Sequence, residues 1–287
     1  MTDVPRETSS GSKIVGTRRL KEPMPAPTKP RIFVVANQKG GVGKTSIVLG
    51  LAGAATVKGL ATLVIDLDPQ GNATSILAAK KPRVTAAGFF EHPTLDTLHE
   101  ALTPCAWEVA PGEVDVICST PDLIKADAFK NVDSFKPKLA KALRRLEGYD
   151  LVLIDCPPSL GSLTRQALAA SNLALVVTTP SYFGLQGAER AAVKIKESRK
   201  KHNPGLELLG VLPNRVKNIS DEHDFRIKEL GQLFGKQVLK PAIPDRIAVQ
   251  QAEGFGQPVQ TIKGEGAREV SEIFEKHLNR IMRAGKK

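Results

Sequence analysis

Cysteine and long hydrophobic runs are scarce in this sequence. Its 287 residues include only three cysteines, Cys105, Cys118 and Cys156, which lie far apart and form no Cys-x-x-Cys pair or Cys/His cluster. We expect reduced cysteines that serve packing, because this spacing suits neither a disulfide framework nor a cysteine-ligated metal. No segment is apolar enough for a signal peptide or a membrane span, so a cytoplasmic protein is expected.

Acidic and aromatic residues are also scarce. The chain has 30 Asp and Glu residues against 41 Lys and Arg residues, which gives a formal net charge of +11. This surplus predicts a polyanionic partner, with nucleic acid as the first candidate. Since few aromatic residues are interleaved with the basic ones, base stacking on single strands is not indicated. Sequence-independent contact with duplex phosphates fits better.

The first 30 residues differ in kind from the rest. They hold five prolines, several Ser and Thr residues and almost no apolar periodicity. Their basic residues are Arg6, Lys13, Arg18, Arg19, Lys21 and Lys29. This composition predicts a basic, Pro-rich tail over residues 1–30 that is disordered when free, followed by one domain over residues 31–287.

A glycine-rich loop stands between an apolar run at residues 31–37 and a helical pattern that starts at Ser46. Strand, loop and helix in this order indicate a phosphate-binding loop for ATP. Lys44 should reach the β- and γ-phosphates, and the Thr45 hydroxyl should ligate Mg²⁺ at the positive end of the helix. The predicted nucleotide contacts in this loop are Lys39, Gly40, Gly41, Val42, Gly43, Lys44, Thr45 and Ser46.

The loop departs from the common phosphate-loop pattern at Gln38, where glycine is usual. The run from Asn37 to Thr45 resembles the deviant Walker A loop of the ParA/MinD class of ATPases. In that class the extra lysine, here Lys39, reaches across a dimer to the partner's nucleotide. The resemblance therefore implies an ATP-bound homodimer, in which a cation delivered in trans stabilises phosphoryl transfer as an arginine finger does.

Two carboxylates end the next buried strand. Asp66 and Asp68 are two residues apart, so both could face the phosphate loop. The phrase from Asp66 to Thr74 resembles the A′ motif of ParA proteins, which implies that Asp68 orients or activates the attacking water. The alternative is a solvated turn in which Asp68 caps the following helix.

A third carboxylate, Asp155, ends the apolar run that begins at Tyr149 and resembles a Walker B strand. We expect it to hold Mg²⁺ opposite Thr45. The three motifs in this order predict an ATP hydrolase. Its catalytic residues are Lys39, Lys44 and Asp68, and its metal site is formed by Thr45 and Asp155.

Further strands are predicted at residues 173–179 and 206–212, and helices near 134–146, 162–171, 185–202 and 222–234. This alternation predicts an α/β P-loop fold whose mainly parallel, twisted sheet is flanked by helices on both faces. A last helix, near 268–283, has an apolar stripe that we expect to pack on the sheet. A membrane-surface helix, as in MinD, is the alternative, but its acidic residues oppose stable association with anionic lipid.

The ParA resemblance implies ATP-dependent, sequence-independent binding to duplex DNA. The candidate contacts are Arg190, Lys194, Lys200, Arg215 and Arg246. A solvated face is the alternative for the basic helix near 185–202. In the segment 243–249, Ala248 replaces an arginine that contacts DNA in the Soj-like type, so that contact cannot be carried over. Asn214 and Pro244 stand where the family lines the adenine pocket, although both could equally be turn residues.

The resemblance covers about residues 31–284, and we expect no helix-turn-helix domain like that of the larger plasmid ParA proteins, because the tail is too short for one. It implies a nucleoid-associated ATPase for chromosome or plasmid partition, whose slow hydrolysis is triggered by a ParB-like centromere-binding protein. Two alternatives stay open. One is a MinD-like or orphan ParA positioning ATPase that acts on membrane or protein cargo. The other is a metabolic P-loop enzyme such as an amidoligase or a metallochaperone.

Overall fold

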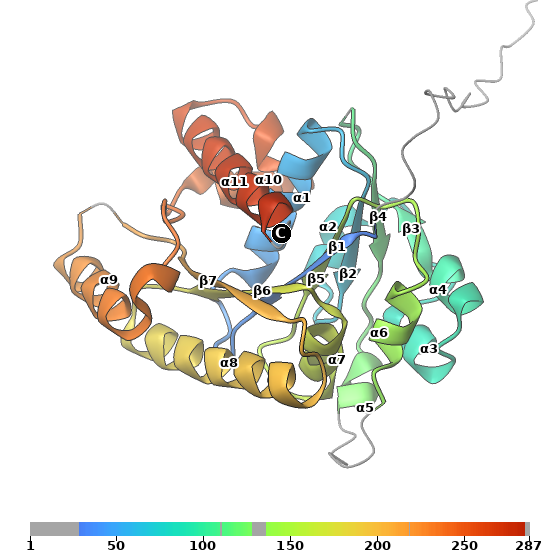
Figure 1. Cartoon of the computed structure of the whole chain (residues 1–287). Coiled ribbons are helices and arrows are strands. Elements are labelled where there is room, and N and C mark those ends of the chain that lie inside the picture. The colour runs from blue at the N-terminus through green and yellow to red at the C-terminus, as the bar shows by residue number, and fades with distance from the viewer. Residues whose placement is uncertain (1–28, 110, 128–135, 218, 285–287) are drawn as a thin grey trace, which may run out of the picture.

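The computed structural model describes residues 29–109, 111–127, 136–217 and 219–284, and all structural statements refer to these ranges. The predicted tail lies almost wholly outside them. A seven-stranded sheet forms the centre, with strand order β3-β4-β2-β5-β1-β6-β7 (Figure 1). Its strands are β1 (Arg31–Ala36), β2 (Thr62–Asp66), β3 (Leu102–Pro104), β4 (Val114–Ile117), β5 (Leu151–Asp155), β6 (Leu173–Thr178) and β7 (Glu207–Pro213). The β3 strand is antiparallel to β4, and the other strand pairs are parallel.

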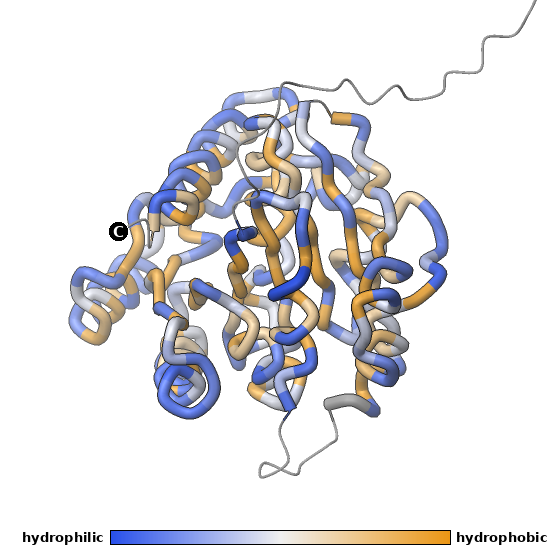
Figure 2. Tube along the Cα trace, turned by 45° about the vertical axis from the view of Figure 1, so that its right-hand side comes forward, coloured by the Kyte–Doolittle hydropathy of each residue, from blue (hydrophilic) through white to orange (hydrophobic). Residues whose placement is uncertain are grey.

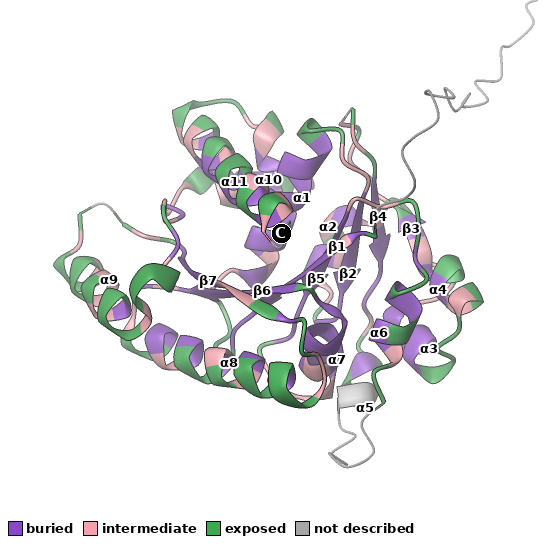
Figure 3. Ribbon diagram, in the orientation of Figure 1, coloured by how far each residue is buried: buried purple, intermediate pink, exposed green. Residues whose placement is uncertain are grey.

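Helices cover both faces of the sheet. One face carries α1 (Lys44–Val57), α2 (Asn72–Leu77), α10 (Ile247–Phe255) and α11 (Glu265–Arg283). The other carries α3 (Ala86–Glu91), α4 (Leu95–Ala101), α5 (Leu123–Asp127), α6 (Lys138–Leu143), α7 (Ser162–Ala170), α8 (Tyr182–Lys201) and α9 (Asp221–Phe234). Hydrophobic residues concentrate along the strands (Figure 2), which are buried between the two layers (Figure 3). The predicted α/β fold is therefore confirmed.

The central strands are apolar because helices cover both of their faces. Every residue of β2, β5 and β6 is buried. The chain passes from β1 through α1 to β2, while β5 occupies the place between β1 and β2. Asp66 and Asp155 end β2 and β5 in direct register. The carboxyl ends of three strands thus meet at one edge of the sheet, where α/β proteins bind their ligands.

The long elements match their predicted ranges better than the short ones. The predicted helices near 162–171, 185–202 and 222–234 correspond to α7, α8 and α9, whereas the helix near 134–146 is the shorter α6. Between β2 and β5 the chain also forms α2 to α5, β3 and β4, which the pattern did not predict. Segments of three to seven residues are too short to show a period.

The apolar stripe of α11 is buried, but its main neighbour is α1 and not, as predicted, the sheet. The ring of Phe274 covers Gly50 of α1 so closely that a Cβ at this glycine would lie 2.2 Å from Phe274 Cζ. A stripe occupied in this way is not available to a lipid surface, which counts against the membrane alternative for this helix. Within the described ranges, no helix combines the length and the apolar character that crossing a bilayer requires.

Phe274→Ala is expected to lower the free energy of unfolding by about 3–4 kcal/mol, because a fully buried ring is lost and Gly50 has no side chain to fill the space. Urea denaturation of the full chain measures the change. Glu272→Ala, on the exposed side of the same helix, is the control and should change stability by less than about 0.5 kcal/mol. Equal losses in both variants would contradict the packing of α11 through this stripe.

Candidate active site

The phosphate loop joins β1 to α1 and is tied to the end of β7. Its Gly43 has a left-handed backbone (φ 88°), and a Cβ at this position would lie 2.2 Å from Asn214 Nδ2. The same nitrogen donates a hydrogen bond of 2.8 Å to the Val42 carbonyl. Glycine is therefore required at position 43, both for the backbone conformation and for the close approach of Asn214.

Lys44 is a buried cation within this loop. The residue is 6% exposed, and its Nζ lies 3.5 Å from the carbonyl oxygen of Lys39. Burial lowers the pKa of Lys44, while Asp155 is the strongest of the nearby groups that act in the opposite direction. A buried ammonium is stabilised by a negative charge beside it, and a bound anion such as a phosphate would supply that charge.

A pocket of about 470 Å³ opens in front of the loop. It is lined by residues of the phosphate loop, by Asp68 from the segment after β2 and by Pro158 from the segment after β5. Arg215 and Glu253, from the C-terminal third of the chain, complete this part of the lining. The fold therefore brings together at one pocket the three motifs that are separate in the sequence.

Thr45 and Asp155 form an oxygen pair at this site. Thr45 Oγ1 donates a hydrogen bond of 2.6 Å to Asp155 Oδ2, while the buried Asp155 Oδ1 has no hydrogen-bond partner among the described residues. Burial raises the pKa of Asp155, and the neighbouring Asp66 adds to this shift. A buried carboxylate with one unpaired oxygen beside a hydroxyl suits a hard divalent cation such as Mg²⁺. In the part of the chain that the structure describes, no group of three or more His, Cys, Asp or Glu residues is placed to hold a metal.

Asp66 shapes the segment after β2. Its carboxylate accepts hydrogen bonds from the backbone N–H groups of Thr74 (2.8 Å) and Asp68 (3.0 Å), and from the Thr74 hydroxyl (2.8 Å). Ser119, just after β4, donates its backbone N–H to Thr74 Oγ1 and its hydroxyl to the Asp68 carbonyl. Asp66 is therefore bonded within its own segment and, unlike Asp68, does not line the pocket.

Asp68 lines the pocket, as its predicted catalytic role requires. Its Oδ1 accepts a hydrogen bond of 3.0 Å from the backbone of Gln70. The alternative that Asp68 serves only to cap the next helix is not realised, because the N-cap of α2 is Gly71 and has no side-chain hydrogen bond. The chemical role of Asp68 remains a prediction.

Lys39 is exposed at the rim of the loop and does not line the pocket of its own chain. Its Nζ lies 5.9 Å from the centroid of the Phe183 ring, a cation–π distance. Gly187 of α8 permits this approach, because a Cβ there would lie 2.4 Å from Asn37 Oδ1 and 3.1 Å from Lys39 Cβ. The loop and α8 together therefore hold the lysine at the surface.

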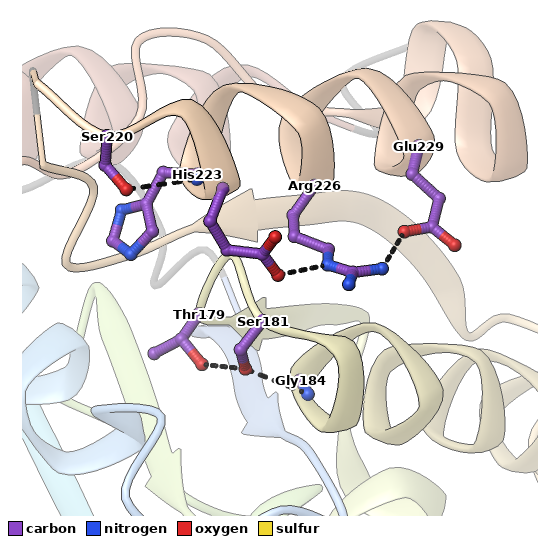
Figure 4. A network of polar contacts seen from close by, with 8 residues as sticks. Thr179, Ser181, Gly184, Ser220, His223, Arg226 and Glu229 are labelled. Atoms are coloured by element: carbon purple, nitrogen blue, oxygen red, sulfur yellow. Dashed lines mark hydrogen bonds and ion pairs between the residues drawn. The ribbon is translucent and has the colours of Figure 1, made fainter.

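Phe183 belongs to an exposed aromatic cluster with Tyr182 and Phe225, each more than half exposed. Phe183 packs edge-to-face against Tyr182 at 5.4 Å between ring centroids. Arg226 connects Tyr182 to Phe225, because its guanidinium lies 5.5 Å and 5.0 Å from their centroids. Arg226 also pairs with Glu229 at 2.8 Å, as part of the polar contacts near the start of α8 and α9 that Figure 4 shows. The aromatic cluster is thus fixed on two helices beside Lys39.

Asn214 and Pro244 meet at a second, narrow pocket of about 20 Å³, which Ser46 and Arg215 also line. Arg215 has a left-handed backbone (φ 56°), and its Nη1 donates a hydrogen bond of 3.2 Å to the Gly41 carbonyl. Such a conformation is uncommon outside glycine and tends to occur at functional sites. Arg215, predicted as a DNA contact, therefore lies against the phosphate loop.

The predicted DNA contacts do not form one patch. Three of them lie on α8. These are Arg190, Lys194 and Lys200. Arg246 instead precedes α10 on the opposite face of the sheet and pairs with Glu269 of α11 at 2.7 Å. Ala248, at the position of the family's arginine, is 9% exposed and packs into the core on that face. The α8 helix therefore remains the candidate DNA surface.

Glu253 is a pocket residue that the sequence did not indicate. It lies on α10 and accepts a hydrogen bond of 2.5 Å from the hydroxyl of Ser46, which is 207 positions earlier in the chain. Ser119 was missed in the same way. No local signal identifies such partners, because only the folded chain brings them to the loop.

Comparisons with known proteins agree with this geometry. A protein-family profile described as an AAA domain matches residues 30–208. The chromosome partitioning protein ParA of Myxococcus xanthus is 34% identical over 240 residues, which are 81% of this chain and 81% of that protein. The chromosome-partitioning ATPase Soj of Thermus thermophilus is 32% identical over 259 residues, 89% of this chain and 98% of that protein. A structure of cobyrinic acid a,c-diamide synthase from Mycobacterium smegmatis, with a bound ATP analogue and magnesium, has a TM-score of 0.74 and 29% identity, covering 90% of this chain and 97% of that one.

Asp66→Ala is expected to destabilise the protein by about 2 kcal/mol, because three donors in the segment after β2 lose their acceptor. Asp68→Ala removes one such bond, to Gln70, and should cost less than about 1 kcal/mol. Thermal and urea denaturation of both variants compare the two effects. If Asp66→Ala were as stable as the unmodified chain, this carboxylate would not hold the segment in place.

Proposed function

Since this chain belongs to the ParA/Soj family of partition ATPases, we propose that it is an ATP hydrolase that segregates a chromosome or a plasmid. Its cofactors in this proposal are ATP and Mg²⁺, supported by the ATP analogue and magnesium in the similar mycobacterial structure. The observation that carries the proposal is the arrangement of one pocket. Lys44, Thr45 and Asp68 line it, while the signature Lys39 is exposed outside it.

Each residue of the pocket has a separate task in hydrolysis. Lys44 donates hydrogen bonds from its buried ammonium to the phosphate oxygens. Thr45 and Asp155 hold Mg²⁺, which neutralises phosphate charge when bound. Asp68 accepts a hydrogen bond from the attacking water and orients it, and Asp66 keeps Asp68 in position through the segment after β2. Hydrolysis is slow until a partner stimulates it, as suits a switch whose output is a change of state.

The ATP-bound form in this proposal is a homodimer. Lys39 does not line its own pocket, so its ammonium is available to the phosphates of a second subunit. The aromatic cluster of Tyr182, Phe183 and Phe225 offers exposed apolar area beside it for the contact between subunits. When two subunits associate, Lys39 leaves its contact with the Phe183 ring and binds the phosphates of the partner's nucleotide. Hydrolysis then depends on dimerisation.

Lys39→Ala is expected to retain ATP binding within about threefold, because the lysine does not line its own pocket, but to lose ATP-dependent dimerisation. Calorimetry measures the first quantity and light scattering at several protein concentrations measures the second. Lys44→Ala is the contrasting variant and should lose ATP binding itself. If the Lys39→Ala protein still dimerised with ATP, the proposal that Lys39 binds the nucleotide of the second subunit would be contradicted.

The proposed DNA surface is α8, whose outer side carries basic residues at several positions. Binding is to duplex phosphates without sequence preference, which associates the ATP-bound dimer with the nucleoid in the cytoplasm. A ParB-like centromere-binding protein triggers hydrolysis and releases the dimer. No stable membrane association is part of this proposal, since the stripe of α11 is already packed on α1.

Two other functions are alternatives that the DNA-binding experiment below can distinguish. A positioning ATPase of the same family would act on protein or membrane cargo, and the burial of Ala248 favours this possibility because the related DNA-contacting arginine is missing. A metabolic enzyme is the other, given the similarity to the mycobacterial diamide synthase. The first would bind no DNA in any nucleotide state, and the second would consume a small-molecule substrate together with ATP.

Random-sequence duplex DNA should bind to the chain with ATP but not with ADP or without nucleotide, and binding should weaken steeply between about 50 and 200 mM salt. Asp68→Ala should bind DNA at least as well with ATP, since it traps the state before hydrolysis. Fluorescence anisotropy with labelled DNA measures both results.

A charge-removing variant of α8, Arg190→Ala with Lys200→Ala, should reduce the salt dependence of binding. The control is Lys276→Ala on the exposed side of α11. If the chain bound no DNA in any nucleotide state while ATP binding and dimerisation were intact, the DNA proposal would be wrong. A protein or membrane cargo would then be the better interpretation.

A further inference from the structure

Glu253 has an unusual position for a carboxylate, beside a site that is expected to hold phosphates. It is half-buried on α10, and its Oε1 accepts the 2.5 Å hydrogen bond from the Ser46 hydroxyl. Glu253 and Asp68 are the carboxylates in the lining of the 470 Å³ pocket. Asp68 has a role toward the attacking water, whereas nothing in hydrolysis requires Glu253.

Ser46 marks the place in the site where Glu253 acts. Ser46 lies in the first turn of α1 and lines both the main pocket and the narrow pocket of Asn214 and Pro244. In the proposed ATP site the β- and γ-phosphates reach Lys44 and the base lies toward Asn214, so the ribose between them lies on the side of Ser46. In this placement Glu253, which is bonded to Ser46, is nearer to the sugar than to the terminal phosphates.

The charge of Glu253 determines which part of the nucleotide it can bind. A carboxylate repels phosphate oxygens and has only acceptor atoms, so it needs a donor. The hydroxyl groups are the donors that a ribose offers. We propose that Glu253 is a specificity-determining residue whose carboxylate accepts hydrogen bonds from the ribose hydroxyls of the bound nucleotide, releasing the Ser46 hydroxyl toward the phosphate chain. This inference rests on the proposed ATP site.

The consequence is selection for ribonucleotides over deoxyribonucleotides. A site built to bond a substrate hydroxyl discriminates against an analogue that lacks it, because the acceptor is then left without its partner. Since Glu253 is only half-buried, water compensates part of this loss. We expect ATP to bind about tenfold more tightly than its deoxy analogues.

Isothermal titration of the full chain with ATP, 2′-deoxy-ATP and 3′-deoxy-ATP, each with Mg²⁺, tests the assignment. The unmodified chain should prefer ATP about tenfold over at least one analogue. Glu253→Ala should lose this preference because ATP binding falls to the level of that analogue, while binding of the analogue itself is unchanged or improved. Glu253→Gln keeps one acceptor oxygen and should retain part of the preference.

Gln251→Ala is the matched control, because Gln251 is exposed on the same helix, and it should leave the preference unchanged. Equal weakening of all three nucleotides in Glu253→Ala would assign Glu253 to a structural link between α10 and the loop, and overturn the proposal. An unmodified chain that binds the three nucleotides equally would also overturn it while leaving the proposed ATPase intact. Failure to bind any of them would reject the ATPase itself and this inference with it. Thermal unfolding of each variant identifies any that do not fold.

Discussion

Two carboxylates, Asp66 and Asp155, are buried in direct register at the ends of neighbouring parallel strands, and the arrangement of the site depends on how each of them is bonded. Asp66 accepts three hydrogen bonds from its own segment, and this bonding places Asp68 at the pocket. Asp155 accepts a hydrogen bond from the Thr45 hydroxyl, and its other oxygen has no hydrogen-bond partner among the described residues, so it can serve as a cation ligand. The same residue type thus has two roles, because one carboxylate is satisfied by the protein and the other is not.

The phosphate loop is clamped between elements from distant parts of the chain. On one side, Asn214 after β7 lies close to Gly43 and bonds the Val42 carbonyl. On the other side, Asn37 and Lys39 lie close to α8 at Gly187, which has no side chain to block them. The loop therefore couples the nucleotide pocket to α8, the helix that carries the aromatic cluster and the candidate DNA surface.

Much of the site could be predicted because its chemistry lies in contiguous motifs. Lys44, Thr45, Asp68 and Asp155 are each recognised by their immediate neighbours, and the structure places all four at one edge of the sheet. Predictions that needed a partner from elsewhere were less accurate. Arg215 was grouped with the basic residues of α8, and the hydrogen bonds of Asp66 to Thr74 were not foreseen, because nothing local shows which way a side chain turns or what it contacts.

By itself, the sequence determined the α/β fold class, the order of the motifs and the surplus of positive charge, since periodicity, short motifs and composition are local properties of the chain. Only the tertiary structure decided that α11 packs on α1, that the basic residues divide between two faces of the sheet, and that Glu253 meets Ser46. These contacts join positions far apart in the chain. They depend on how the helices pack against one another and on the sheet, and no local pattern in the sequence records that packing.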